Sequence, residues 1–296
     1  EGKRMFNELV EGKNKKNVDN LISINEKDLV DIGLVDSDGN SVKITRDMMN
    51  AVYMMLENED NTRHLIYGGL TVPDLKGYYK GKNEAFGKGA VRAEIMQGKF
   101  VDEIHRIREQ IETVKDSNAA DKAEQLDELY EQRDLLVARA YSKAAEIKNK
   151  IAEQMTDYDR AWIAKAKEFF DGFSRDQMNA VTLAVYGFEK ARIENYFPIH
   201  TDSAFRNEDF GVIQKAASLE NMGFTKERVF SGSPIMLEGL TDVINGHIDD
   251  IANYAGLMPS VREFQKVYGK NMTDENGLTS VQNALREKFG TQGRKY

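Results

Sequence analysis

The chain has 296 residues, of which 41% are hydrophobic, so it is long enough to bury one large core or two ordinary ones. It contains no cysteine, which excludes disulfide bridges, thiolate nucleophiles and zinc sites with sulfur ligands. The net charge of −8 disfavours non-specific binding to the phosphate backbone of nucleic acids. Only four prolines and long stretches of Glu, Lys, Ala, Leu and Arg predict a mainly α-helical, multi-helix fold.

Residues 1–90 are predicted to form a small N-terminal lobe with an irregular or β-hairpin part, one or two helices and a glycine-rich loop. The Asp-Gly pair at 38–39, between apolar stretches, is typical of a hairpin turn. Thr45 precedes an amphipathic run and is expected to cap a helix that ends near 58–61. The paired glycines and the proline of the apolar segment 65–73 favour a structured turn.

Between residues 91 and 155, apolar side chains recur at spacings of three, four and seven. This periodicity predicts two antiparallel helices that form an extended hairpin, with its turn near the polar stretch 115–118. Each helix would measure roughly 30 to 50 Å at about 1.5 Å per residue. The narrow stripe resembles a coiled-coil seam, and the charged faces outside it favour a protein partner or self-association through the hairpin.

Residues 156–296 are predicted to form a C-terminal helical bundle. Its first helix is expected to follow a Thr156 cap and to end near Gly172, and Ser174 is expected to cap a second helix. Pro259 is typical of the first turn of a helix, so it is expected to separate two further helices. A last amphipathic stretch has apolar residues at helical spacing, namely Leu278, Val281, Leu285 and Phe289.

Two histidines with nearby carboxylates suggest an alternative function. His200 is followed by Asp202, and His247 and Asp250 would share one face of a predicted helix. If these four side chains met, they would suit the metal centre of a hydrolase or nuclease-like enzyme. A histidine hydrogen-bonded at a chain reversal is the commoner arrangement, and no motif of a catalytic serine or cysteine is present. The main prediction therefore contains no catalytic, cofactor-binding or metal-binding residue.

Arg192, Tyr196 and Phe197 suggest another alternative, because an aromatic and basic surface suits single-stranded nucleic acid. Such an interaction surface would fit the nucleic-acid-binding segment of a DNA-transfer protein. The acidity of the chain argues against nucleic acid, and aromatic residues beside Pro198 are more typical of a hydrophobic corner that locks helices together.

The sequence has no run of 18 apolar residues and no N-terminal secretion signal, so no membrane association is expected and the predicted location is the cytoplasm or a virion. The first residue is Glu1, not methionine, and the last residues form a polar run directly after an amphipathic segment. Both features favour a fragment of a larger polypeptide.

Several strings resemble helical regions of very large multidomain, polyvalent proteins encoded by bacteriophages, prophages and conjugative elements of gut Firmicutes. The strings are Thr45-Arg46-Asp47 to Gly68-Gly69, Tyr186-Gly187-Phe188-Glu189-Lys190 to Asn195-Tyr196-Phe197-Pro198-Ile199, and Ser233-Pro234-Ile235 to His247 and Asn253-Tyr254. The resemblance implies a segment without catalytic residues, located between better-known domains of a protein that travels with mobile DNA or sits in the virion. Together with the hairpin, it predicts a non-catalytic structural or protein-interaction module.

Overall fold

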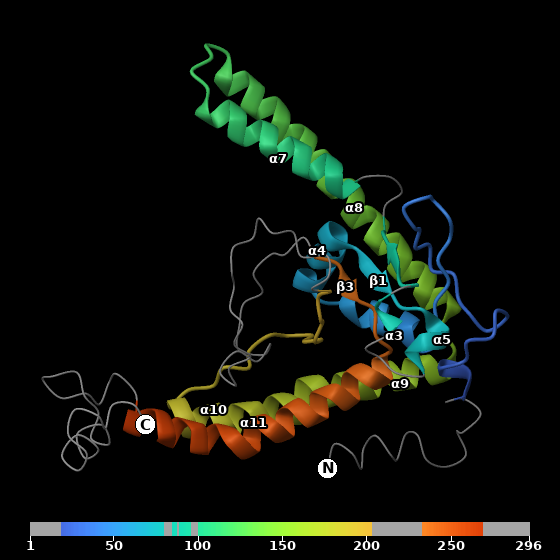
Figure 1. Ribbon diagram of the computed structural model, residues 1–296, viewed down its shortest axis with the longest axis vertical. Coiled ribbons are helices and arrows are strands. Elements are labelled where there is room, and N and C mark those ends of the chain that lie inside the picture. The colour runs from blue at the N-terminus through green and yellow to red at the C-terminus, as the bar shows by residue number, and fades with distance from the viewer. Residues whose placement is uncertain (1–18, 80–84, 88, 96–99, 203–232, 269–296) are drawn as a thin grey trace, which may run out of the picture.

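The computed structural model describes residues 19–79, 85–87, 89–95, 100–202 and 233–268. In these ranges the chain is mainly α-helical with one small three-stranded sheet, which confirms the predicted fold class. Several helices and the sheet form a body, and two pairs of helices extend from it in different directions (Figure 1). No described helix is long and apolar enough to cross a lipid bilayer.

The first part of the body follows the sequence-based expectation closely. Isolated antiparallel bridges join Val30 to Ile44 and Val35 to Ser41, on either side of the predicted Asp-Gly turn. Helix α3 (Arg46–Met55) follows directly. Its cap is Thr45, whose side chain accepts a hydrogen bond from the backbone N–H of the third helical residue at 3.3 Å. Local sequence signals therefore account for this region.

The prediction of a turn over residues 65–73 is wrong in its first half. Helix α4 (Glu59–Gly68) occupies that half, and strand β1 (Leu70–Val72) follows. The side chain of Asn58 caps α4, which the sequence analysis did not recognise as a helix start. Gly69 separates helix and strand with a φ of +70°, a backbone conformation that favours glycine.

The sheet joins segments that are far apart in the sequence. Strand β1 lies in the centre, with β2 (Val91–Ala93) on one side and β3 (Ile235–Met236) on the other. Leu70 pairs with Ala93 in the antiparallel β1–β2 ladder and with Ile235 in the parallel β1–β3 ladder. The sheet thereby fixes the start of the C-terminal helix against the N-terminal helices.

Helices α7 (Phe100–Asp116) and α8 (Lys122–Gln154) lie side by side, run in opposite directions and project from the body (Figure 1). We call this pair the arm. Helix α8 has 33 residues and is therefore about 50 Å long. Its second half contacts α3 and α4, and its fully buried side chains are confined to that half: Ala140, Ala144, Ile147 and Ile151. Coiled-coil packing within the arm stays a prediction.

Three of the remaining helical segments follow one another without a break and form a rod, and a further helix of the same chain packs along it. Helix α9 (Asp157–Glu168) passes through a π-helical segment, η1 (Phe169–Ser174), into α10 (Arg175–Tyr186). Helix α11 (Leu240–Tyr268) packs along α10 (Figure 1). A π-helix is rare in proteins and inserts an extra residue per turn, which changes the direction in which the following side chains point.

Two predicted helix boundaries in this region are wrong. The chain does not leave the helix at Gly172, because η1 connects α9 to α10 and the hydroxyl of Ser174 bonds to His247 without capping α10. Pro259 does not begin a new helix but lies inside α11. The predicted amphipathic stretch at 278–289 lies outside the described residues.

One contiguous core contains side chains from the predicted N-terminal lobe (1–90), the predicted hairpin (91–155) and the predicted bundle (156–296). Among its fully buried members are Met48 from α3, Phe170 from η1 and Tyr254 from α11. The three predicted parts therefore share one core in the described portion of the chain.

Candidate functional site

The short segment that contains His200 is held beside strand β3. The backbone N–H of Met236 donates to the carbonyl of His200 at 2.8 Å, and the N–H of Asp202 donates to the carbonyl of Pro234 at 2.9 Å. The imidazole of His200 is largely exposed, with 59% of its side-chain surface accessible, and its Nδ1 lies 2.6 Å from Oε2 of Glu238. This histidine therefore pairs with a carboxylate that the sequence analysis did not select.

His247 lies deep in the core. Its ring packs against Phe169, Phe170 and Tyr196, with centroid distances between 5.2 and 6.0 Å, and its Nε2 lies 2.8 Å from Oγ of Ser174. Burial, together with the nearby His200, lowers the pKa of His247 to about 3. The ring is thus neutral at physiological pH and holds α11 against η1.

The metal centre considered as an alternative is not assembled. His200 is close enough to influence the charge of His247 and of Asp250, but the two imidazoles have different hydrogen-bond partners. Asp202 is buried, whereas Asp250 is exposed on α11. Within the described ranges, no group of three or more His, Asp or Glu side chains is arranged to hold a metal ion. The proposed ligand set His200, Asp202, His247 and Asp250 is therefore corrected to two separate histidine pairs.

The predicted aromatic and basic surface needs a similar correction. Tyr196 is 6% exposed and Phe197 is 0% exposed, and both rings pack edge-on against Phe170. They form the hydrophobic corner that was the competing interpretation, so they have almost no surface on which a base could stack. Arg192 remains exposed.

A buried polar cluster connects α3 to the start of α11, and the sequence analysis missed it. The carboxylate of Asp47 accepts hydrogen bonds from the backbone N–H and the hydroxyl of Thr241, at 3.1 and 3.0 Å. Nearby, the hydroxyl of Tyr78, from helix α5 (Leu75–Tyr78), donates to Asp242 at 2.7 Å and accepts from the N–H of Gly239 at 3.1 Å. Two distant segments thus share the first turn of α11.

Burial dominates the electrostatics of this cluster. Burial, with a smaller effect of the neighbouring carboxylate of Asp242, raises the pKa of Asp47 to about 7, although the hydrogen bonds from Thr241 act in the opposite direction. Burial also raises the pKa of the Tyr78 hydroxyl, which therefore stays protonated and acts as a donor. Local sequence patterns around Asp47 do not indicate its contact with Thr241, because the two residues are 194 positions apart.

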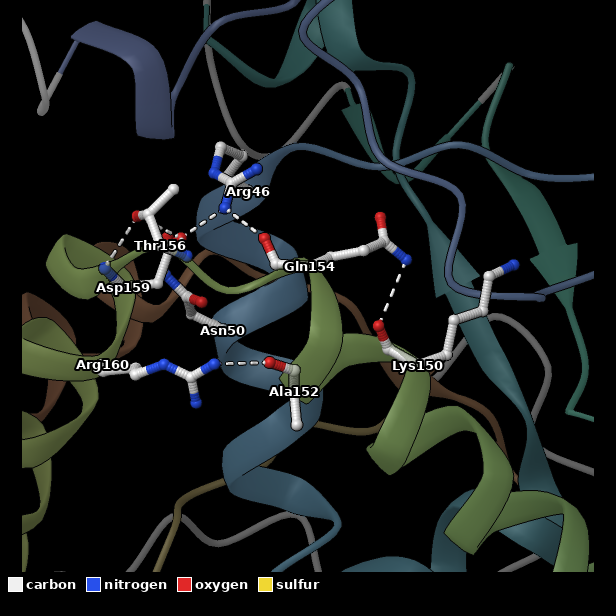
Figure 2. A network of polar contacts seen from close by, with 8 residues as sticks. All are labelled: Arg46, Asn50, Lys150, Ala152, Gln154, Thr156, Asp159 and Arg160. Atoms are coloured by element: carbon white, nitrogen blue, oxygen red, sulfur yellow. Dashed lines mark hydrogen bonds and ion pairs between the residues drawn. The ribbon is translucent and has the colours of Figure 1, made fainter.

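Figure 2 shows a second buried network, at the junction of α3, α8 and α9. Arg46 donates to the carboxylate of Asp159 and, at 2.9 Å, to the backbone carbonyl of Gln154. Asn50 donates to the other oxygen of Asp159 at 3.1 Å, and Thr156 completes a capping box. Although burial raises the pKa of Asp159, the hydrogen bonds from Arg46 and Thr156 lower it below its usual range.

This network forms one wall of an open cavity of about 530 Å³. The other walls come from residues 20–21 and 27–30. The guanidinium of Arg46 is used for Asp159 and a backbone carbonyl, so its visible role is to hold α3 to the α8–α9 junction.

The arm provides a surface of a different kind. Residues 109–134 contain nine Asp or Glu and three Lys or Arg, a net charge of −6, against −8 for the whole chain. All nine acidic side chains are exposed. On α7 the apolar side chains of Ile104, Ile107 and Ile111 are turned inward, each at most 4% exposed. Most of the net charge of the protein is therefore at the projecting end of the arm.

Scans against models of known protein families, against characterised proteins and against solved structures give no match to this chain. The class of protein is therefore defined by the fold: a mainly α-helical body with a small mixed sheet and a projecting, acidic helical arm.

Proposed function

We propose that the chain is a non-catalytic interaction module whose arm binds a partner protein through a basic surface on that partner. The observation that carries the proposal is the concentration of exposed carboxylates on the projecting end of the arm, over residues 109–134. A field of one sign on a protruding element accelerates encounter with a partner of opposite charge and disfavours partners of like charge.

The same charge argues against contact between the ends of two arms. Two copies of residues 109–134 side by side would bring together two segments with a net charge of −6 each. Like charges placed opposite each other across an interface are destabilising. A different, basic protein is thus a better partner for the end of the arm than a second copy.

The roles of the histidines support the non-catalytic part of the proposal. His247 is neutral, buried and bonded to Ser174, and His200 pairs with Glu238. Each imidazole connects two segments of the fold. Acid–base catalysis needs a titrating group within reach of a substrate, which the buried His247 is not, and the exposed imidazole of His200 is already engaged by Glu238.

We further propose, from the resemblance alone, that the module is a segment of a large phage or mobile-element protein and functions in the cytoplasm or the virion. The strings that carry the resemblance meet in the body. A Cβ atom on Gly68 would lie 2.5 Å from the carbonyl oxygen of Ser233, and Asn61 donates to the carbonyl of Phe197 at 3.0 Å. These residues thus build the body that supports the arm.

Site-specific photo-crosslinking in the natural host tests the function of the arm. A benzophenone amino acid replaces Leu135, which is 68% exposed on the arm, or Leu257, which is 51% exposed on α11 and serves as the control position. We expect crosslinks to another polypeptide from position 135 only. Those crosslinks should disappear when Glu124, Asp127, Glu128 and Glu131 are all replaced by Gln.

Equal crosslinking from both positions, or crosslinks at 135 that persist in the Gln variant, would contradict the proposal. Light scattering of the purified protein between about 1 and 200 µM tests whether the arm instead mediates self-association. A concentration-dependent dimer that crosslinks at 135 to itself would show self-association in place of a basic partner.

A further inference from the structure

A second surface lies on α10, on a part of the molecule well removed from the arm (Figure 1). There, a groove of about 540 Å³ runs between α10 and the chain segment that follows it. This volume is in the range of binding pockets for small molecules and short peptide segments. The polar and apolar side chains that line it include Arg175, Asp176, Asn179, Leu183, Glu189 and Arg192.

The wall of the groove is held in place by hydrogen bonds. The side-chain amide of Asn179 donates to the carbonyl of Ala191 at 3.1 Å and accepts from the N–H of the same residue at 2.8 Å. The hydroxyl of Thr182 accepts from the N–H of Lys190 at 3.3 Å. Three bonds from two turns of α10 thus fix the backbone opposite, so the shape of the groove exists before any ligand binds.

Two arginines line this groove, and each uses only part of its donors on the described residues. Arg175 donates to the backbone carbonyl of Asp171, and Arg192 donates through Nε to the backbone carbonyl of Glu189 at 3.0 Å. Neither guanidinium forms an ion pair with a carboxylate of the described residues, although Asp176 and Glu189 line the same groove. Since a guanidinium has five N–H donors, each arginine retains donors for a carboxylate ligand.

The two acidic residues and the apolar rim indicate the kind of ligand. Asp176 and Glu189 balance the charge of the two arginines, so the groove does not favour a continuous polyanion such as a nucleic acid. Leu183, which is 52% exposed, offers an apolar contact at the rim. An extended peptide with a carboxylate, a neighbouring apolar side chain and free backbone or side-chain N–H donors satisfies all three features.

We propose that this groove binds an acidic peptide segment of another protein, with Arg175 and Arg192 as the carboxylate-binding residues. The site is independent of the arm, because its proposed binding groups are arginines and it lies on a different part of the fold. In this proposal Arg192 is still an interaction residue, but its ligand is a peptide and not a nucleic acid.

Selection from a displayed library of random twelve-residue peptides tests the proposal. The full chain is the target, and the Arg175→Gln/Arg192→Gln double variant is used for counter-selection. We expect enriched peptides to contain Asp or Glu beside an apolar residue. In fluorescence anisotropy, a labelled enriched peptide should bind the double variant at least about tenfold more weakly, because two charge-assisted contacts are lost.

Matched controls make the result specific. Arg106→Gln/Arg139→Gln removes the same charge from exposed arginines of the arm and should leave peptide affinity unchanged. Leu183→Asp places a competing carboxylate at the groove rim while leaving both arginines intact, and should also weaken binding by about tenfold or more. This variant changes an exposed residue, so it keeps the test valid even if the double arginine variant fails to fold.

Three results would overturn the inference: no enrichment over the double variant, enriched peptides without acidic residues, or an affinity that depends on Arg106 and Arg139 instead of the groove. A labelled twelve-nucleotide oligothymidine is measured in parallel. Binding of that probe, if it were lost in Arg175→Gln/Arg192→Gln while peptides failed to bind, would assign the groove to nucleic acid.

Discussion

Asp47 and Thr241 are 194 positions apart in the chain, yet the carboxylate of Asp47 accepts both the backbone N–H and the hydroxyl of Thr241. The N-terminal end of α11 lacks intrahelical partners for its first N–H groups, and a carboxylate at that position satisfies one of them. A side chain of α3 thus performs the role that a local capping residue performs in most helices. The position of α11 depends on this contact.

Substitution of Gly239 by alanine should destabilise the protein. A Cβ atom at this position would lie 2.4 Å from Oδ2 of Asp47, so the carboxylate or the start of α11 must shift. We expect a loss of about 1 to 3 kcal/mol in the free energy of unfolding, measured by urea denaturation. Gly246→Ala, with open space around its position in α11, is the control and should be neutral or stabilising by up to about 1 kcal/mol.

The raised pKa of Asp47 predicts a specific dependence of stability on pH. The folded protein binds a proton at Asp47 up to about pH 7, whereas the ordinary value is 3.8, so its contribution is full below about pH 4 and is lost as pH rises to 7. The free energy of unfolding of the wild type, measured in urea, should therefore fall from pH 4 to pH 7 relative to that of Asp47→Asn, by on the order of a few kcal/mol. If stability depends on pH in the same way in both proteins, the prediction is wrong, because the pKa of Asp47 is then not raised by folding.

His247 predicts the opposite slope. Its pKa is lowered from 6.5 to about 3, so the folded state binds fewer protons than the unfolded chain between these values, and stability is lost as pH falls below 6.5. Relative to His247→Phe/Ser174→Ala, the wild type should lose stability from pH 7 to pH 4 in urea titrations. A constant difference between the two proteins would be inconsistent with a neutral, buried imidazole. Ser174→Ala alone should cost about 1 kcal/mol at pH 7.

Removal of Arg46 should be among the most damaging single changes. Arg46→Met leaves the carboxylate of Asp159, whose side chain is 0% exposed, without its charged partner. Loss of one partner of a buried ion pair costs about 3 to 5 kcal/mol, which thermal and urea denaturation would detect. Arg63→Met breaks the exposed pair with Asp60 and should cost less than about 1 kcal/mol. Similar losses for both variants would mean that Arg46 and Asp159 are not buried as a pair.

The helical content was predictable from the sequence because its signals are local. Thr45 and Thr156 cap the helices that follow them, as their positions before amphipathic runs indicated. Helix α4 was missed because Gly68 and Gly69 resembled a turn, while the helix is stabilised by Asn58 and by contacts with α7 and α8. Pro259 was misplaced because packing along α10 maintains α11 across a residue that local rules assign to a helix start.

The candidate sites were less predictable, since a single sequence does not show which distant side chains meet. His200 and His247 were selected only for a conditional metal site, and their observed partners Glu238 and Ser174 had no distinguishing pattern in the sequence. The aromatic side chains of Tyr196 and Phe197 would suit either a nucleic-acid-binding surface or a hydrophobic corner. Only their burial in the structure distinguishes the two interpretations. Arg192 was selected as part of a nucleic-acid surface, and Arg175 gave no signal before the groove that both residues line was visible.

The sheet order β2-β1-β3 has a consequence for folding during synthesis. Strand β1 is complete early, but its parallel neighbour β3 and the α11 residues that bond to Asp47 are translated more than 150 residues later. Contacts of such long sequence separation form slowly, because a large loop must close first. Until then the β3-facing edge of β1 has unpaired backbone groups, so a nascent chain that stalls before residue 235 would be prone to aggregation or capture by a chaperone.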